Sequence, residues 1–294
     1  DDLMAKRFIF VGNRRFVLQE MLANKLEVTN VIVVRDSHLH RDIENNIVSG
    51  IKSYIVVGCK DELLCSLKEI KFDVLVSNGC PYILPIKDLP VARYVNIHPS
   101  CLPDLRGVDP VIGAILHARD AGATCHVMDD GIDTGAIISQ ERIKYSKDID
   151  VTTLYQLSFI AEKRAFRKAL ELEFKEQRIQ NENIDNIYYS RTPNDWQISF
   201  NESNEELIRK VKAFNNRSIG CEFKFGERGF RVYGLMKMQN HFLIEIVKEF
   251  PDGVIALSYE NNIVFRKDNE VLRMFDVTPD DGIPLAVGDS LFSK

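Results

Sequence analysis

The chain has 294 residues, of which 45% are hydrophobic, so it can fill a sizeable core and exceeds the usual size of one domain. This composition excludes a chain that is disordered as a whole. Its 38 Lys and Arg residues against 43 Asp and Glu residues give a formal net charge of −5, which disfavours bulk binding of nucleic acid. Residues 201–294 carry 13 basic and 15 acidic side chains, a net charge of −2, so the C-terminal part is no basic arm.

Six cysteines are scattered along the chain, and no two of them form a Cys-x-x-Cys pair. We therefore expect reduced thiols and no bound metal. No apolar run approaches the roughly 18 residues of a membrane span, and the first residues lack the pattern of a signal peptide. The sequence predicts a cytoplasmic protein without a membrane partner.

The first half alternates β-rich runs with helical patterns, which predicts an α/β fold with a mostly parallel, Rossmann-like sheet covered by helices. We expect strands at 8–12, 31–34, 53–57 and 74–78, and helices at 16–22 and 61–70. Farther along, we expect a helix at 109–118, strands at 123–128 and 136–143, and the longest helix at 150–177.

Two stretches of this half show no regular pattern. Residues 94–107 have little helical or strand periodicity, and prolines at 99, 103 and 110 fix the backbone φ angle and forbid a continuous helix. The acidic, glycine-rich residues 129–135 are expected to form a loop. Irregular loops that leave the end of a sheet strand are where α/β folds place their ligands.

The composition changes at residues 181–196, which are polar and rich in asparagine, and we expect a linker there. A short helix at 205–214 is followed by expected strands at 230–232, 242–246, 254–256, 262–265 and 271–275. Strands at this spacing indicate a small barrel or open sheet. We therefore divide the chain into a Rossmann-like catalytic domain at 1–185 and a smaller, β-rich, barrel-like domain at 186–294.

Asn96 and His98 are two residues apart, so in an extended backbone their side chains leave the same face. An acid from the 129–135 loop would complete the parts that acyl transfer needs: a donor for the oxyanion, a base, and a carboxylate that orients the base. Each part also has an ordinary interpretation, because a lone histidine is often structural and an Asp-Gly loop is often only a turn.

Two motifs favour the catalytic interpretation. Residues 96–107 read Asn-Ile-His-Pro-Ser-Cys-Leu-Pro-Asp-Leu-Arg-Gly, and residues 128–135 read Met-Asp-Asp-Gly-Ile-Asp-Thr-Gly. Together they resemble the paired signature of the folate-dependent formyltransferase superfamily, which includes methionyl-tRNA, glycinamide ribonucleotide and sugar-nucleotide formyltransferases. Residues 78–85 resemble the family's loop against which the pterin ring packs. The Arg-Thr-Pro-Asn-Asp sequence at 191–195 is most similar to the sugar-modifying members.

The resemblance implies a role for each residue of the motif. Asn96 would donate to the oxyanion, His98 would be the base toward the incoming amine, and Asp133 would raise the basicity of His98. The formyl donor would be 10-formyltetrahydrofolate. The residues that the resemblance places around this folate are Cys80, Tyr82, Ile83, Leu84, Asp129 and Gly131.

The acceptor implied by the resemblance is a nucleotide-linked amino sugar of the dTDP-amino-dideoxyhexose type, formylated for surface polysaccharide such as the O-antigen of lipopolysaccharide. A diphosphate needs positive partners. The candidates for substrate binding are Ser100, Arg106, Arg14 and Arg15. The two adjacent arginines are equally explained as surface charges, and Arg106 as a structural residue of its loop.

Other functions remain open at this stage. The acidic balance speaks against a methionyl-tRNA formyltransferase, which needs a positive surface for tRNA. Formylation of another small amine is a second alternative, and a catalytically silent binding protein with this fold is a third. The first strand lacks the G-x-G-x-x-G fingerprint, so hydride transfer has little support. We expect small-molecule partners, no nucleic acid, and a homodimer.

Overall fold

Alternation along the first strand creates a sheet that is buried on both faces. In β1 (Arg7–Gly12), Phe8 and Phe10 join the core on one face, while Ile9 and Val11 join the core on the other. All four side chains are buried. A strand that is apolar on both sides needs covering layers on both faces of its sheet, as in a doubly wound α/β fold.

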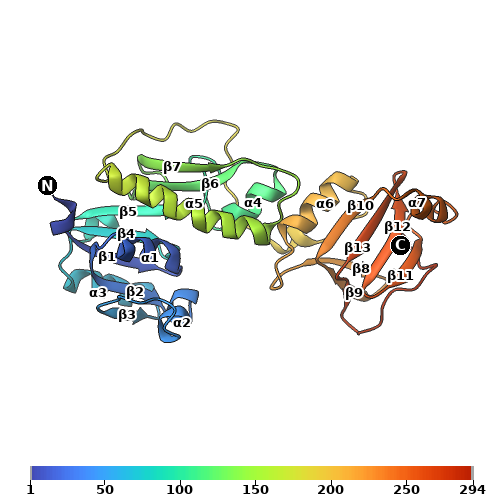
Figure 1. Ribbon diagram of the computed structural model, residues 1–294, viewed down its shortest axis with the longest axis horizontal. Coiled ribbons are helices and arrows are strands. Elements are labelled where there is room, and N and C mark those ends of the chain that lie inside the picture. The colour runs from blue at the N-terminus through green and yellow to red at the C-terminus, as the bar shows by residue number, and fades with distance from the viewer. Residues whose placement is uncertain (1, 293–294) are drawn as a thin grey trace. The chain divides into compact units, whose positions relative to one another are not determined.

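The computed structural model describes residues 2–292 and contains this sheet (Figure 1). Seven strands lie in the order β3-β2-β1-β4-β5-β6-β7. The strands from β1 to β5 are parallel, whereas β6 and β7 are antiparallel to their neighbours. The mostly parallel, Rossmann-like sheet is therefore confirmed. The other strands are β2 (Glu27–Val34), β3 (Tyr54–Val57), β4 (Val74–Asn78), β5 (Arg93–His98), β6 (Ala121–Val127) and β7 (Ile137–Ile143).

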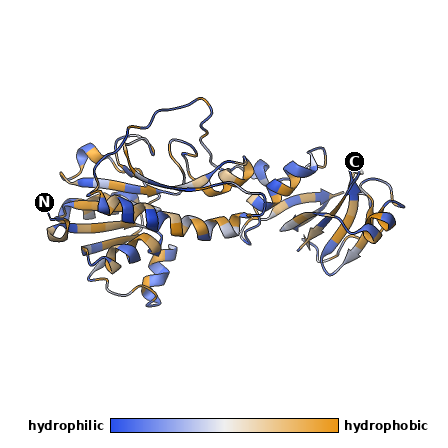
Figure 2. Ribbon diagram, turned by 45° about the horizontal axis from the view of Figure 1, so that its top comes forward, coloured by the Kyte–Doolittle hydropathy of each residue, from blue (hydrophilic) through white to orange (hydrophobic). Residues whose placement is uncertain are grey.

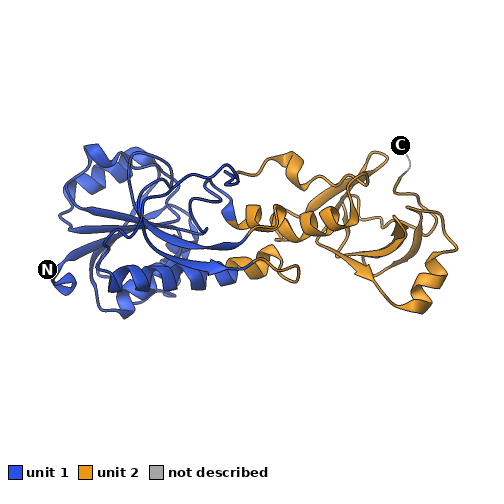
Figure 3. Cartoon of the chain, turned by 90° about the horizontal axis from the view of Figure 1, so that it is seen from above, with its two compact units in different colours: residues 1–110, 120–144, 156–189 blue, residues 111–119, 145–155, 190–294 orange. Residues whose placement is uncertain are grey.

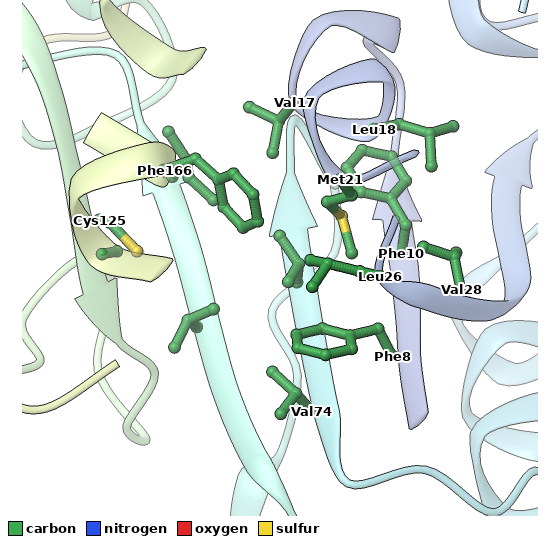
Figure 4. Packing of buried hydrophobic residues seen from close by; sticks show 14 of the residues in the cluster. Phe8, Phe10, Val17, Leu18, Met21, Leu26, Val28, Val74, Cys125 and Phe166 are labelled. Carbon is green, nitrogen blue, oxygen red and sulfur yellow. The ribbon is translucent and has the colours of Figure 1, made fainter. Parts of the chain in front are cut away.

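Helices cover both faces of this sheet. Val17 and Met21 of α1 and Phe166 of α5 pack in one core with Phe10 (Figure 4). Leu63 of α3 packs in the core of the opposite face. The strands between these layers are coloured largely as hydrophobic in Figure 2. The helices of this half are η1 (Leu3–Ala5), α1 (Arg15–Ala23), α2 (His38–Glu44), α3 (Lys60–Glu69), η2 (Ile86–Asp88), α4 (Pro110–Leu116) and α5 (Val151–Glu171).

Residues 94–98 show little periodicity in the sequence, yet they belong to β5, so Asn96 and His98 lie at the end of a strand. This strand lies between β4 and β6, where Val95 and Ile97 are buried. A strand buried on both faces does not alternate apolar with polar residues, so its sequence gives no clear period. The helix expected at 150–177 is also shorter than predicted. It ends at Glu171, and positive φ angles of 52° and 56° at Glu173 and Phe174 end the helical backbone.

The C-terminal strands form two separate antiparallel sheets in the described part of the chain, and not one closed barrel. One sheet has the order β10-β13-β12-β11 and the other has the order β14-β9-β8. The elements after α5 are η3 (Pro193–Trp196), α6 (Asn204–Ala213), β8 (Cys221–Phe225), β9 (Arg228–Val232), β10 (Gly234–Met238), α7 (His241–Val247), β11 (Ile255–Tyr259), β12 (Asn262–Lys267), β13 (Glu270–Phe275) and β14 (Thr278–Pro279).

The strand expected at 242–246 is wrong, because these residues form α7. The Asn240 side chain caps the helix by accepting from the backbone N–H of Leu243 at 3.0 Å. Leu243, Ile244 and Val247 then pack on the core that contains Val264. A spacing of three and four residues is helical, but a five-residue apolar run does not reveal it.

The chain divides into two compact units (Figure 3). The first contains residues 1–110, 120–144 and 156–189, and the second contains residues 111–119, 145–155 and 190–294. Two short segments that precede residue 156 thus belong with the C-terminal unit. Within residues 2–292, no helix is long and apolar enough to cross a bilayer.

Candidate active site

The first unit contains a cavity of about 540 Å³ at the carboxyl ends of β4 and β5. The chain adds β2 and β3 on one side of β1 and then adds β4 and β5 on the other side. The direction of winding therefore reverses between β1 and β4. Open α/β sheets bind ligands at such a switch point. All the residues predicted for catalysis and for the folate line this cavity, and of the four substrate candidates only Arg14 does.

His98 ends β5 with its imidazole buried. Its Nε2 lies 2.9 Å from the backbone carbonyl of Leu105. Because a carbonyl only accepts, Nε2 carries a proton, and the basic lone pair of the neutral ring is on Nδ1. Burial lowers the pKa of His98 below its ordinary value of 6.5, against the opposing effect of Asp133. His98 is therefore a neutral base at neutral pH.

The Asp133 carboxylate faces this lone pair, with its Oδ2 3.5 Å from His98 Nδ1. Its Oδ1 lies 3.6 Å from Nε2 of a second imidazole, His126. Burial alone would raise the pKa of Asp133, but the positive charge that each imidazole carries when protonated, together with the backbone N–H of Gly107, lowers it below its usual range. The carboxylate is thus ionised and stabilises a proton on His98 Nδ1.

Asn96 is held by His126, a residue that the sequence did not single out. His126 Nδ1 lies 2.9 Å from the Val127 carbonyl and therefore carries a proton, which leaves Nε2 to accept from Asn96 Nδ2 at 3.1 Å. Asn96 and His126 are paired directly across β5 and β6. The second N–H of the Asn96 amide remains to donate elsewhere. A histidine in an otherwise uncharged strand, opposite Asn96, is the signal that would have found this contact.

The residues predicted for the folate lie on two loops of the cavity wall. Asp129 accepts from the backbone N–H of Gly131 at 3.0 Å and from the Thr134 hydroxyl at 2.7 Å, so its carboxylate closes a turn. On the other loop, Leu84 is buried and burial raises the pKa of the Cys80 thiol, which makes Cys80 a small apolar wall residue.

Arg14 is the only lysine or arginine that lines this cavity in the described chain. Its Nε and Nη2 donate to the buried Glu162 carboxylate at 3.3 and 2.8 Å. The Asn78 amide donates to the same carboxylate at 2.9 Å. Burial raises the pKa of Glu162, and these two partners oppose the rise. The remaining Nη1 lies near Gly79 at the cavity wall.

The other three substrate candidates do not line the cavity. Arg15 pairs with Asp42 at 3.0 Å. The Ser100 hydroxyl donates to the Asp104 carbonyl at 2.8 Å, and the side chain is buried. Arg106 is held by other residues of the fold, with its Nη1 2.6 Å from Glu182. Each of these three side chains thus has a partner within the fold. Distance along the sequence from a motif cannot show such a partner.

The assembled groups suit acyl transfer. A buried neutral imidazole with its lone pair toward a carboxylate can accept a proton, and an oriented amide N–H can stabilise negative charge on an oxygen. Within residues 2–292, no cluster of histidine, cysteine or acidic side chains is arranged to hold a metal ion.

Comparison with known proteins agrees with this chemistry. Residues 11–170 match the family model described as Formyl transferase. The methionyl-tRNA formyltransferase of Ehrlichia ruminantium (strain Gardel) is 31% identical to this chain over 157 residues. The matched region is 52% of this chain and 51% of that protein, so the chain spans about half the length of this relative.

The solved structures that share the fold include two N-formyltransferases. WlaRD, a sugar 3N-formyl transferase crystallised with dTDP and 5-N-formyl-THF, gives a TM-score of 0.67 at 22% identity and covers 92% of this chain and 97% of its own. The N-formyltransferase from Helicobacter canadensis, in complex with folinic acid and dTDP-3-aminofucose, also gives 0.67, at 20% identity over 92% of this chain and 99% of its own. Because the family model covers more than half of the residues, the chain belongs to the formyl transferase family.

Proposed function

We propose that this protein is an N-formyltransferase that moves a formyl group from 10-formyltetrahydrofolate to the primary amine of a nucleotide-linked amino sugar. The observation that carries the proposal is the cluster of Asn96, His98 and Asp133 in one cavity, with His98 Nδ1 facing the Asp133 carboxylate at 3.5 Å. We assign this chemistry to the expected domain at 1–185.

The folate supplies the formyl group, bound to nitrogen. When the amine attacks the formyl carbon, it loses a proton, which His98 accepts at Nδ1 and Asp133 stabilises there. The free N–H of Asn96 donates to the formyl oxygen, where negative charge develops. The proton held by His98 is then available to the nitrogen that leaves the formyl carbon. Proton and charge thus balance across the transfer without a further reactant.

The cavity walls support a folate as the donor. Ile83 and Leu84 from one loop, and Met128 and Ile132 from the other, provide apolar side chains that suit a flat heterocycle. The backbone of such irregular loops offers N–H and C=O groups to the ring nitrogens and oxygens. The two structures of the same fold hold 5-N-formyl-THF and folinic acid.

Charge favours a small nucleotide sugar over tRNA as the acceptor. The chain has a net charge of −5, and residues 201–294 have a net charge of −2, so no excess of positive charge favours a tRNA. A single diphosphate needs only a local cation, and Arg14 provides one. Both structures of the same fold were obtained with dTDP or a dTDP-sugar.

Methionyl-tRNA formylation is the second candidate, because the matched E. ruminantium protein carries that name. The two functions separate in one assay. We expect mass spectrometry to show a gain of one formyl group on a dTDP-linked amino sugar when 10-formyltetrahydrofolate is present, and no formylation of methionyl initiator tRNA. Salt-sensitive binding of tRNA together with formylation of its methionyl group would reject the sugar assignment and leave the catalytic residues in place.

Arg14 should contribute to acceptor binding, whereas its neighbour should not. We expect Arg14→Gln to raise KM for the nucleotide sugar about tenfold or more, because it removes the only permanent cation of the cavity wall. KM for the folate should stay nearly constant. Arg15→Gln is the matched control, since it removes the same charge at the next residue. The Arg15 side chain pairs with Asp42 and does not line the cavity. Equal effects of the two substitutions in steady-state kinetics would contradict a specific contact.

A further inference from the structure

Gln180 lies in the irregular segment between α5 and η3, and its amide is buried against the active-site loops. The Nε2 group donates to the backbone carbonyls of Asp133 and Gly135, both at 2.8 Å. The Oε1 atom accepts from Arg106 Nη2 at 3.0 Å. Both hydrogens and the oxygen of this amide are therefore used.

The partners of Gln180 belong to the two loops that meet at the Asp133 carboxylate. Within one loop, Leu105 accepts from His98 Nε2 and Gly107 donates its backbone N–H to Asp133. Arg106, between these two residues, is the one that donates to Gln180. Gln180 thus connects the loop that orients His98 with the loop that carries Asp133.

The backbone of Asp133 needs such a restraint. Its φ angle is 55°, in the left-handed region that residues other than glycine rarely adopt. A strained backbone persists when surrounding contacts determine it. The two carbonyl contacts from Gln180, at Asp133 and at Gly135, hold both ends of this part of the loop.

We propose that Gln180 is a positioning residue that keeps the Asp133 carboxylate at His98 Nδ1. The proposal rests on the proposed function, because it assigns Gln180 to the base that this function uses. Gln180 lines no part of the cavity and contacts no reacting atom. It acts through the backbone of Asp133.

The test compares Gln180→Met with Gln177→Met. Methionine keeps the length of the side chain but removes both donors, so the two carbonyls lose their partner. Gln177 is exposed in the same segment, and its side chain donates only to the Lys175 carbonyl, so it is the matched control. We expect kcat to fall roughly 10- to 100-fold in the Gln180 variant, with KM for both substrates nearly unchanged, and no change in the control.

A second readout needs no substrate. NMR titration of His98 should show a lower pKa in the Gln180 variant, because a displaced carboxylate raises that pKa less. The titratable and charged groups that face His98 are Asp133, His126 and Arg14, and of these only Asp133 is bonded to Gln180. Asp133→Asn should shift the His98 pKa in the same direction, and adding Gln180→Met to it should change the pKa little further.

The possible outcomes test the positioning role of Gln180 separately from the proposed acceptor. A folded Gln180→Met variant with an unchanged His98 pKa, or with a shift that adds fully to that of Asp133→Asn, would overturn the positioning role. A wild-type protein that formylates no amino sugar would reject the proposed acceptor, while the titration would still decide the role of Gln180.

Discussion

Replacing His98 with asparagine or alanine is expected to lower the rate of formyl transfer roughly 10²–10⁴-fold, the usual cost of losing a general base. His98 Nδ1 is the lone pair that faces the Asp133 carboxylate in the cavity. Asparagine also offers an N–H in place of the one that His98 gives to the Leu105 carbonyl, so the loop should keep its place. Single-turnover kinetics with 10-formyltetrahydrofolate and the amino sugar would measure the effect.

Folding is the control for the His98 variants. Circular dichroism and urea denaturation should show a folded protein, and binding of the folate should be retained. A folded His98→Ala variant with turnover near that of the wild type would rule out the proposed base.

Asp133→Asn should lower turnover at neutral pH by a comparable factor, because the charge of the carboxylate favours the protonated imidazole. Asparagine tolerates the positive φ angle of 55° at this position, so the backbone should survive the change. Asp130→Asn is the matched control in the same loop. Asp130 is exposed and pairs with Lys87 at 2.6 Å, so its loss should leave turnover intact. The reverse pattern would show that the acid had been assigned to the wrong residue.

The pH profile gives the same pair a second test. Burial lowers the pKa of His98, so the neutral base persists below pH 6.5, and the rate should fall only as the pH drops through that lowered value. Asp133 raises this pKa, so Asp133→Asn should move the acid limb of the profile to a still lower pH while the plateau falls. A limb that moved upward would contradict the electrostatic role.

Much of the first unit could be predicted from the sequence because its signals are local. The first strand carries alternating Phe and Ile or Val residues whose two sets pack on opposite faces, and turn residues separate it from the next helix. Asn96 and His98 lie on one strand, and the Asp133 loop is recognisable by its glycines. The resemblance of the two motifs to one family then indicated that Asp133 belongs to the same site as Asn96 and His98, although it is far from them in the sequence.

The rest depends on contacts that no local pattern encodes. His126 reaches the site because β6 is antiparallel to β5, and that pairing sets it opposite Asn96. Gln180 lies in an irregular segment, where a polar residue looks like ordinary surface. The side chains of Arg15 and Arg106 turned out to be bound by Asp42 and Glu182, which depends on the tertiary fold and not on their distance from a motif.

The packing of α5 bears on the order in which the chain can fold. Phe166 packs in one core with Phe8, Phe10 and Met21 (Figure 4). Glu162 of the same helix is the partner of Arg14. The first of these residues leave the ribosome more than 140 positions before α5 does. At a synthesis rate of roughly 5–20 residues per second, the part of this core that α5 covers stays open for seconds. During that interval the nascent chain exposes apolar side chains of β1 and α1 that α5 later covers, and chaperones bind exposed apolar segments of this kind.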